Sequence, residues 1–475
     1  MGNRGTNGMS APNCGNSLTK GAQTRMRGAR LRSAKALALA LVLTVPMAAG
    51  GCTYFEDLFS KEEVPLPGTR VSILTTQRTL APDESLKGQQ ILLPAPSPNP
   101  DWPQPGGYPN HAMHHIMVPE NLSEAWSTDV GQGEDDELRI LGSPVAAAGR
   151  IYTMDSESEV YATDAKTGDV MWHVALAPES EEDDGLLSGG VTYDNGSVFA
   201  ATGFGHVVAL EAATGKELWR TPVSAPMHAA PTVRGGRVFV VTLDNRTFAL
   251  DAKTGQQIWD HSGITESASI LGSASPAVDQ GVVVVPYSSG ELVALRTENG
   301  RLLWSDSLAS LKRSDIVSAL SHIRGRPVID RGRVIAISHS GIMAAYDLRT
   351  GRRIWERDIG GIESPWVAGD YIFVLTNDSE VAAVNRDTGG VYWVRPLPQF
   401  ENPEKQKDPI IWTGPILASD RLIVAGSHGS AWALSPYSGA FIGEVEMPDG
   451  ISVPPIVADG RVIFLTDEAE LIAYQ

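Results

Sequence analysis

The chain has 475 residues, 42% of them hydrophobic, and its 56 acidic and 38 basic residues give a formal net charge of −18. Seven basic residues and no acidic residue lie within 1–51, so removal of that segment takes the net charge from −18 to −25. Such an acidic surface makes nucleic acid and anionic lipid headgroups unsuitable partners. Only two cysteines are present, Cys14 and Cys52, so no disulfide framework can hold residues 53–475 together.

The first 51 residues have the pattern of a signal peptide. An apolar run, ALALALVLTV at 36–45, follows a basic region formed by Arg25, Arg27, Arg30, Arg32 and Lys35. The run is short for a membrane span but typical of a signal peptide, and Met26 would be a more ordinary start than Met1. Met-Ala-Ala-Gly-Gly-Cys52 then resembles a bacterial lipobox, which predicts lipid modification of Cys52. The alternative is an ordinary secretory signal cleaved near Ala49.

Residues 52–118 are rich in proline and include LLPAPSPNPDWPQPGGYPNH. This composition predicts an extended tether, partly polyproline II, that holds a folded domain away from the bilayer. We expect Trp102 to pack on the surface of that domain. His111, His114 and His115 lack the ligand spacing of a zinc site, so we expect a surface histidine cluster and no metal.

From residue 119 onward the pattern Val-x-Ala-Leu-Asp-x-x-Thr-Gly-x-x-x-Trp recurs, and the copies lie 38 to 51 residues apart. A seventh copy, AWALSPYSGAFIG, has Gly443 where the others have tryptophan. This period is typical of propellers and solenoids, whose units bury their apolar faces by stacking. The six complete copies end at Trp172, Trp219, Trp259, Trp304, Trp355 and Trp393.

Each repeat is predicted to contain four strands, because two further β-branched or apolar runs, such as APTVRGGRVFVV, precede each copy. Four short antiparallel strands make a propeller blade. The Asp-x-x-Thr-Gly segment should form the turn before the outer strand, and the tryptophan should dock on a neighbouring blade.

The two ends of residues 119–475 together supply the four strands of an eighth blade. The last segment, PPIVADGRVIFLTDEAELIAYQ, holds three strands, whereas NLSEAWSTDVG near residue 126 offers one outer strand with Trp126. Pairing these ends predicts an all-β, eight-bladed propeller over residues 119–475, closed by its first and last strands. The alternative is an open β-solenoid.

The residues of the predicted propeller do not fit an enzyme that binds a quinone cofactor. Quinoprotein dehydrogenases bind pyrroloquinoline quinone, and many stack it on a vicinal disulfide, but residues 119–475 contain no cysteine and no C-x-x-C-H motif. Asp164, Asp251 and Asp347 recur at one turn position, as structural residues do. We therefore predict a protein without cofactor, metal or catalytic activity. A periplasmic quinoprotein dehydrogenase is the alternative, and a ligand-sensing or peptidoglycan-binding propeller is a third hypothesis.

The lipobox, the tether and the tryptophan repeats together resemble the BamB family, propeller lipoproteins of the outer-membrane β-barrel assembly machinery. PLPGTRVSIL and WPQPGGYPNHAM resemble its alphaproteobacterial branch. The resemblance implies a non-catalytic scaffold, monomeric within a hetero-complex, that is lipid-anchored at the periplasmic face of the outer membrane. It also implies docking on the periplasmic domains of the barrel-inserting subunit, BamA. Thr53 after the lipidated cysteine agrees with outer-membrane sorting, although inner-membrane retention stays open.

The resemblance also locates a partner-binding surface on two loops of adjacent central blades. The corresponding stretches are ESASILGSASP, which carries Ile270 and Leu271, and LSHIRGRP, which carries His322 and Arg324. His322 and Arg324 stand where better-known members have acidic residues, so the polar half of the contact differs. The alternatives are that these are plain connecting loops, or that a partner strand pairs with an exposed sheet edge.

Overall fold

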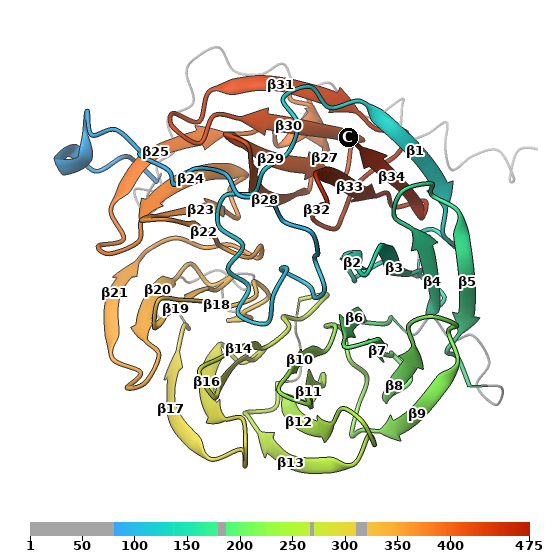
Figure 1. The fold of residues 1–475 in the computed structure, drawn as a ribbon. Coiled ribbons are helices and arrows are strands. Elements are labelled where there is room, and N and C mark those ends of the chain that lie inside the picture. Colours follow the sequence, from blue (N-terminus) through green and yellow to red (C-terminus); the bar gives the residue numbers. More distant parts are fainter. Residues whose placement is uncertain (1–79, 136, 179–186, 267–269, 310–320) are drawn as a thin grey trace, which may run out of the picture. The chain divides into compact units, whose positions relative to one another are not determined.

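The computed structural model describes residues 80–135, 137–178, 187–266, 270–309 and 321–475, which belong to one compact unit (Figure 1). In these ranges the chain forms eight four-stranded antiparallel sheets, one two-stranded sheet and one short 3-10 helix, η1 (Glu84–Leu86). The eight sheets surround a common centre, so the prediction of an all-β, eight-bladed propeller is confirmed. This described part contains no helix with the length and apolar character needed to cross a bilayer.

Seven blades are continuous in the chain, and each runs from its inner to its outer strand. Blades 1 and 2 comprise β2 (Val145–Ala147), β3 (Arg150–Met154), β4 (Glu159–Asp164), β5 (Val170–Ala175), β6 (Gly190–Asp194), β7 (Ser197–Ala201), β8 (His206–Glu211) and β9 (Glu217–Pro222). Blades 3 and 4 comprise β10 (Thr232–Arg234), β11 (Arg237–Val241), β12 (Arg246–Asp251), β13 (Gln257–Ser262), β14 (Ala277–Asp279), β15 (Val282–Pro286), β16 (Glu291–Arg296) and β17 (Leu302–Ser307).

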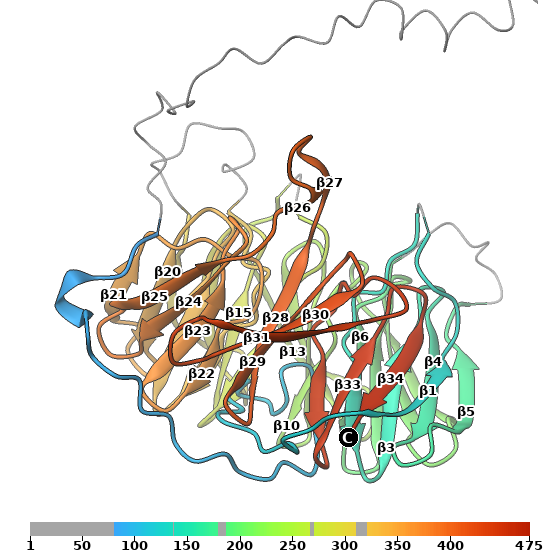
Figure 2. The ribbon, with the colours of Figure 1, turned by 90° about the horizontal axis from the view of Figure 1, so that it is seen from above.

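Blades 5 and 6 comprise β18 (Val328–Asp330), β19 (Arg333–Ile337), β20 (Met343–Asp347), β21 (Arg353–Arg357), β22 (Trp366–Ala368), β23 (Tyr371–Leu375), β24 (Glu380–Asn385) and β25 (Val391–Pro396). Blade 7 comprises β28 (Trp412–Ala418), β29 (Arg421–Gly426), β30 (Ser430–Leu434) and β31 (Phe441–Glu446). Between blades 6 and 7, β26 (Phe400–Asn402) and β27 (Lys407–Pro409) form a hairpin that projects from one face of the ring (Figure 2).

Blade 8 is built from both ends of the propeller. It contains β32 (Ile456–Ala458), β33 (Arg461–Leu465) and β34 (Glu470–Tyr474), and its outer strand is β1 (Glu124–Asp129). β1 and β34 are antiparallel, with Trp126 opposite Ala473, and reciprocal backbone hydrogen bonds of 3.0 and 2.9 Å join Ser123 to Gln475. The predicted closure by the first and last strands is therefore confirmed, and the open solenoid is not.

The outer-strand tryptophans dock each blade on the next. Each indole ring lies against the glycine of the Thr-Gly turn in the following blade, so close that a Cβ on that glycine would come within 3.0 Å of the ring. These glycines also have positive φ, which disfavours other residues. The docked pairs are Trp126–Gly168, Trp172–Gly215, Trp219–Gly255, Trp259–Gly300, Trp304–Gly351, Trp355–Gly389 and Trp393–Gly439.

Gly443 occupies the tryptophan position of blade 7, and the ring closure explains this exception. The turn on which a tryptophan would dock connects the third and fourth strands of the next blade. In blade 8 those strands are β34 and β1, which come from opposite ends of the propeller, so no such turn connects them. A tryptophan at 443 would have no glycine turn to pack against, and no atom lies within 4 Å of a Cβ built at this position.

Residues 97–118, which we call the axial segment, cross the centre of the ring on the face opposite the β26–β27 hairpin (Figures 1 and 2). The segment forms hydrogen bonds of 2.6 to 3.3 Å with the inner strand of every blade. From blade 1 to blade 8 the bonded pairs are Trp102–Ala146, Pro103–Tyr193, Gln104–Val233, Pro109–Val278, Asn110–Ile329, His114–Trp366, Ile116–Leu417 and Asn99–Val457.

The axial segment corrects two predictions about residues 52–118. This part of the expected tether belongs to the same compact unit as the ring, so the boundary at 119 is too late. His111 and His115 are buried, and their Nδ1 atoms lie 2.7 Å from the backbone carbonyls of Pro327 and Pro94. Trp102 packs on the ring as expected, with its indole stacked on that of Trp366 at 6.1 Å. The predicted signal peptide and Cys52 lie outside the described residues.

Candidate partner-binding site

The two loops that carry the predicted partner-binding residues precede β14 and β18, the inner strands of blades 4 and 5. In a propeller all connections from an outer strand to the next inner strand lie on one face, here the face of the β26–β27 hairpin. The backbone N–H of Ile270 donates a hydrogen bond to Nδ1 of His322, at 3.2 Å. The structure thus joins the two loops directly, although 52 residues separate this pair in the sequence.

The four residues differ in what they offer to a partner. Leu271 is 45% exposed, and the side chain of Arg324 is about a quarter exposed. Ile270 is half-buried, and His322 is buried. Leu271 and Arg324 therefore form the accessible part of the surface. His322, also a predicted partner-binding residue, is buried between the two loops.

Burial determines the charge state of His322. It lowers the pKa of His322 to about 4, and the nearby Arg324 adds to this effect. The ring is therefore neutral at pH 7, which leaves the Nδ1 lone pair available to accept the Ile270 N–H. Protonation would remove this acceptor and place a second positive charge beside Arg324.

Two residues of this surface had not been predicted from the sequence. Glu363, from the loop before β22, lies 4.0 Å from the guanidinium of Arg324 and accepts a hydrogen bond of 3.2 Å from Thr413 Oγ1. Gly272 has φ +86°, and a Cβ there would be 2.9 Å from Nε of Arg324. The Leu-Gly-Ser turn could have suggested the glycine, but Glu363 comes from another blade and carries no local signal.

Acidification is expected to loosen the contact between the two loops. The pKa of His322 is lower in the folded chain than the ordinary 6.5, so the unfolded chain binds more protons between pH 6.5 and 4. Stability is therefore lost as the pH falls through this window. Between pH 7 and pH 5 the free energy of unfolding should fall by about 1–2 kcal/mol more in the wild-type chain than in His322→Asn, which retains an acceptor for Ile270.

Urea unfolding at pH 7, 6 and 5 measures this difference, and His173→Asn, on the outer strand β5, is the surface control. Equal pH dependence in the wild type and His322→Asn would show that His322 does not lose its proton on folding.

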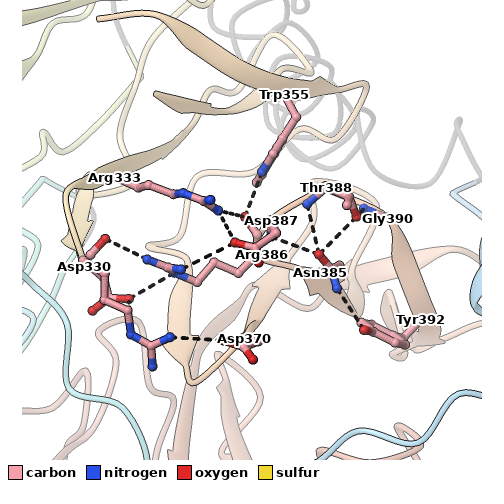
Figure 3. Close-up of polar contacts among 11 residues, drawn as sticks. Asp330, Arg333, Trp355, Asp370, Asn385, Arg386, Asp387, Thr388, Gly390 and Tyr392 are labelled. Atoms are coloured by element: carbon pink, nitrogen blue, oxygen red, sulfur yellow. Dashed lines mark hydrogen bonds and ion pairs between the residues drawn. The ribbon is translucent and has the colours of Figure 1, made fainter. Parts of the chain in front are cut away.

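A buried ion pair holds blade 5, which carries the second loop, against blade 6 (Figure 3). Nε of Arg386 lies 3.0 Å from Oδ2 of Asp330, and a second guanidinium nitrogen donates to the Asp330 carbonyl at 2.9 Å. The Arg386 carbonyl accepts the Trp355 indole N–H at 2.9 Å. His114 of the axial segment lies 3.5 Å from the other Asp330 oxygen, so this cluster connects two blades and the segment.

Comparison with known proteins identifies the family. The family model described as "Outer membrane protein assembly factor BamB" matches residues 119–186 and 156–395. The outer membrane protein assembly factor BamB of Shigella dysenteriae is 34% identical over 345 residues, which cover 71% of this chain and 85% of that protein. Its name describes an assembly factor and not an enzyme, in agreement with the prediction of a non-enzymatic protein.

Two solved structures share the fold. The crystal structure of BamB from Moraxella catarrhalis has a TM-score of 0.64 at 21% identity and covers 75% of this chain and 100% of that one. The quinohemoprotein alcohol dehydrogenase of Comamonas testosteroni has a TM-score of 0.59 at 15% identity, covering 79% and 80%. At these identities the likeness concerns the propeller alone. The family model and the curated relative decide the assignment: the chain belongs to the BamB family.

Proposed function

We propose that this protein is a non-catalytic scaffold in the assembly of outer-membrane β-barrel proteins, and that it docks on the periplasmic domains of a BamA-like subunit. Family membership supports the assembly role. The observation that carries the docking surface is the junction of two loops from adjacent blades, with Leu271 exposed beside Arg324. An exposed apolar side chain on a rigid support is a typical interface anchor.

We further propose that the mature protein is anchored through lipid on Cys52 at the periplasmic face of the outer membrane, and is a monomer within the hetero-complex. The lipobox-like sequence before Cys52 supports the anchor. Several acyl chains on one residue hold a protein stably at a membrane. Residues 53–79 would then connect the anchor to the propeller.

Replacement of Leu271 by aspartate is expected to weaken capture of the partner about tenfold or more, because a charge at the centre of an apolar contact must be desolvated. Affinity capture of the tagged, lipidated protein from detergent-solubilised membranes measures this, with the barrel-inserting subunit quantified in the eluate. Circular dichroism and urea unfolding confirm that the ring is intact.

Leu218→Asp is the matched control, because Leu218 is 52% exposed on the outer strand β9, away from both loops. This variant should capture the partner as the wild type does. Equal capture by Leu271→Asp and wild type would contradict the proposed surface. Loss of capture in both variants would indicate that an outer strand edge contributes to binding.

A further inference from the structure

A cavity lies at the centre of the ring, between the axial segment and the loops that precede several inner strands. Its volume is about 30 Å³, which limits an occupant to a few heavy atoms. Trp102, Gly106 and His111 line it from the axial segment, and Arg326, Glu363 and Trp366 line it from blades 5 and 6. Leu271 and Arg324 do not line the cavity, which shares only Glu363 with the candidate partner-binding surface.

Three nitrogen atoms of the lining residues are buried and have no hydrogen-bond partner within the described ranges: Trp102 Nε1, His111 Nε2 and Arg326 Nε. Trp102 is only 3% exposed and His111 only 6%, so bulk water does not readily satisfy them. A buried polar group without a partner costs about 1–3 kcal/mol. Three of them line one cavity, so an occupant that bonds to all three would be stabilised there.

The chemistry of the three groups differs. Nδ1 of His111 lies 2.7 Å from the Pro327 carbonyl, which can only accept, so Nδ1 carries the hydrogen. Burial, together with the nearby Arg326, lowers the pKa of His111 to about 3, so the ring is neutral and its Nε2 is an acceptor. The Trp102 indole is a donor. The guanidinium of Arg326 is a charged donor.

Positive charge is in excess at this cavity. Burial lowers the pKa of Arg326, although the Glu363 carboxylate opposes this shift. Glu363 is already engaged by Arg324 at 4.0 Å and by the Thr413 hydroxyl at 3.2 Å. The charges that act on Arg326 are the Glu363 carboxylate and the like charge of Arg324. The single negative charge of Glu363 thus faces two positive guanidinium groups. A bound anion would neutralise the remaining positive charge.

Gly106 leaves space between the groups. A Cβ at this position, where φ is +80°, would lie 3.1 Å from the His111 ring and 3.3 Å from Nε of Arg326. The glycine therefore lets the chain turn beside both groups and keeps the space between them open.

We propose that this cavity binds a small oxyanion that retains one proton, of which hydrogen phosphate is the simplest example. Arg326 and Trp102 donate hydrogen bonds to its charged oxygens, and its remaining O–H donates to Nε2 of His111. Charge-assisted bonds from a guanidinium supply most of the affinity, and the acceptor on His111 selects for a protonated oxygen.

Calorimetric titration of the full lipidated chain with sodium phosphate, in detergent at pH 7 and constant ionic strength, tests this site. Sulfate has a similar size and charge but no proton at this pH, so it leaves His111 Nε2 unpaired. We expect it to bind about tenfold more weakly than phosphate, a difference equivalent to 1.4 kcal/mol. Arg326→Gln should abolish phosphate binding.

Trp102→Phe provides a test that does not depend on the folding of the arginine variant. It removes the indole N–H but keeps an aromatic ring against Trp366, and it should weaken phosphate binding about tenfold. Trp126→Phe is the matched control, because the Trp126 Nε1 is also buried without a partner but lies at the junction of blades 8 and 1. This control should bind phosphate as the wild type does.

Absence of heat or of any thermal shift with phosphate would overturn the proposal and leave ordered water as the occupant of the cavity. Equal binding by Trp102→Phe and Trp126→Phe, or equal affinity for sulfate and phosphate, would also overturn it, because the named donor and acceptor would then play no part.

Discussion

Asp330→Ala is expected to lower the free energy of unfolding by about 3–5 kcal/mol, because it removes the buried carboxylate partner of Arg386 and leaves only the exposed Asp387, 3.6 Å away. The pair is buried on both sides, with Arg386 Nε 3.0 Å from the Asp330 carboxylate. The substitution should also weaken the packing of the axial segment on the ring, since His114 contacts the same carboxylate. Equilibrium unfolding in urea, followed by tryptophan fluorescence, measures the change.

Asp370→Ala is the matched control, because the Asp370 side chain is 68% exposed and pairs with Arg331 at 3.0 Å. An exposed pair contributes about 0–1 kcal/mol, so this variant should unfold nearly as the wild type does. The double replacement Asp330→Leu with Arg386→Met should recover most of the loss, since it removes both buried charges. A similar small cost for Asp330→Ala and Asp370→Ala would refute the role assigned to the buried pair.

Trp259→Ala is expected to destabilise the ring by about 3–5 kcal/mol, the usual cost of removing a buried aromatic side chain. The ring of Trp259 lies 5.8 Å from that of Phe239 and packs on Gly300 of the next blade. Its Nε1 donates to the Thr297 carbonyl at 3.0 Å. The substitution removes a contact between blades 3 and 4, and thermal and urea unfolding should both report it.

Two further variants separate packing from hydrogen bonding. Trp259→Phe keeps a ring at the junction but loses the bond to Thr297, so it should cost less than Trp259→Ala. Gly443→Trp restores the repeat pattern in blade 7 and should give no gain in stability, because blade 8 lacks the Thr-Gly turn. A stabilisation of 2 kcal/mol or more in Gly443→Trp, about the value of a buried large side chain, would contradict this explanation.

Repetition made the propeller predictable. In each blade the turn residues and the outer strand lie within twenty residues, so one repeat specifies one hairpin. The docking contact joins the tryptophan to the glycine of the next copy, and it was predictable because both recur at fixed positions. The sequence has one unpaired strand at Trp126 and only three strands in its last repeat, which predicted that these ends form one blade and close the ring. The pairing of β1 with β34 confirmed this prediction. The absence of a tryptophan at Gly443 was visible in the sequence, but its cause became clear only from the placement of both chain ends in blade 8.

The position of the axial segment could not be predicted from repeated sequence patterns. Its prolines and glycines suggested an extended chain, whereas the segment contains hydrogen-bonded turns at 104–107 and 108–111. Nothing periodic indicated that it would bond to eight inner strands. Those bonds are made largely by backbone groups, which every residue possesses. His111 and His115 resembled surface residues for the same reason, since the carbonyls that bind them belong to Pro327 and Pro94.

Local patterns in this chain specified the blade, its turns, the number of blades and the way the ring closes, because the groups that form them are neighbours in sequence or recur at a fixed position. The pairing of Asp330 with Arg386, the junction of Ile270 with His322 and the cavity beside Arg326 arose only when separate blades met. These features depend on distances between residues from different blades or from the axial segment, and no stretch of sequence encodes such a distance.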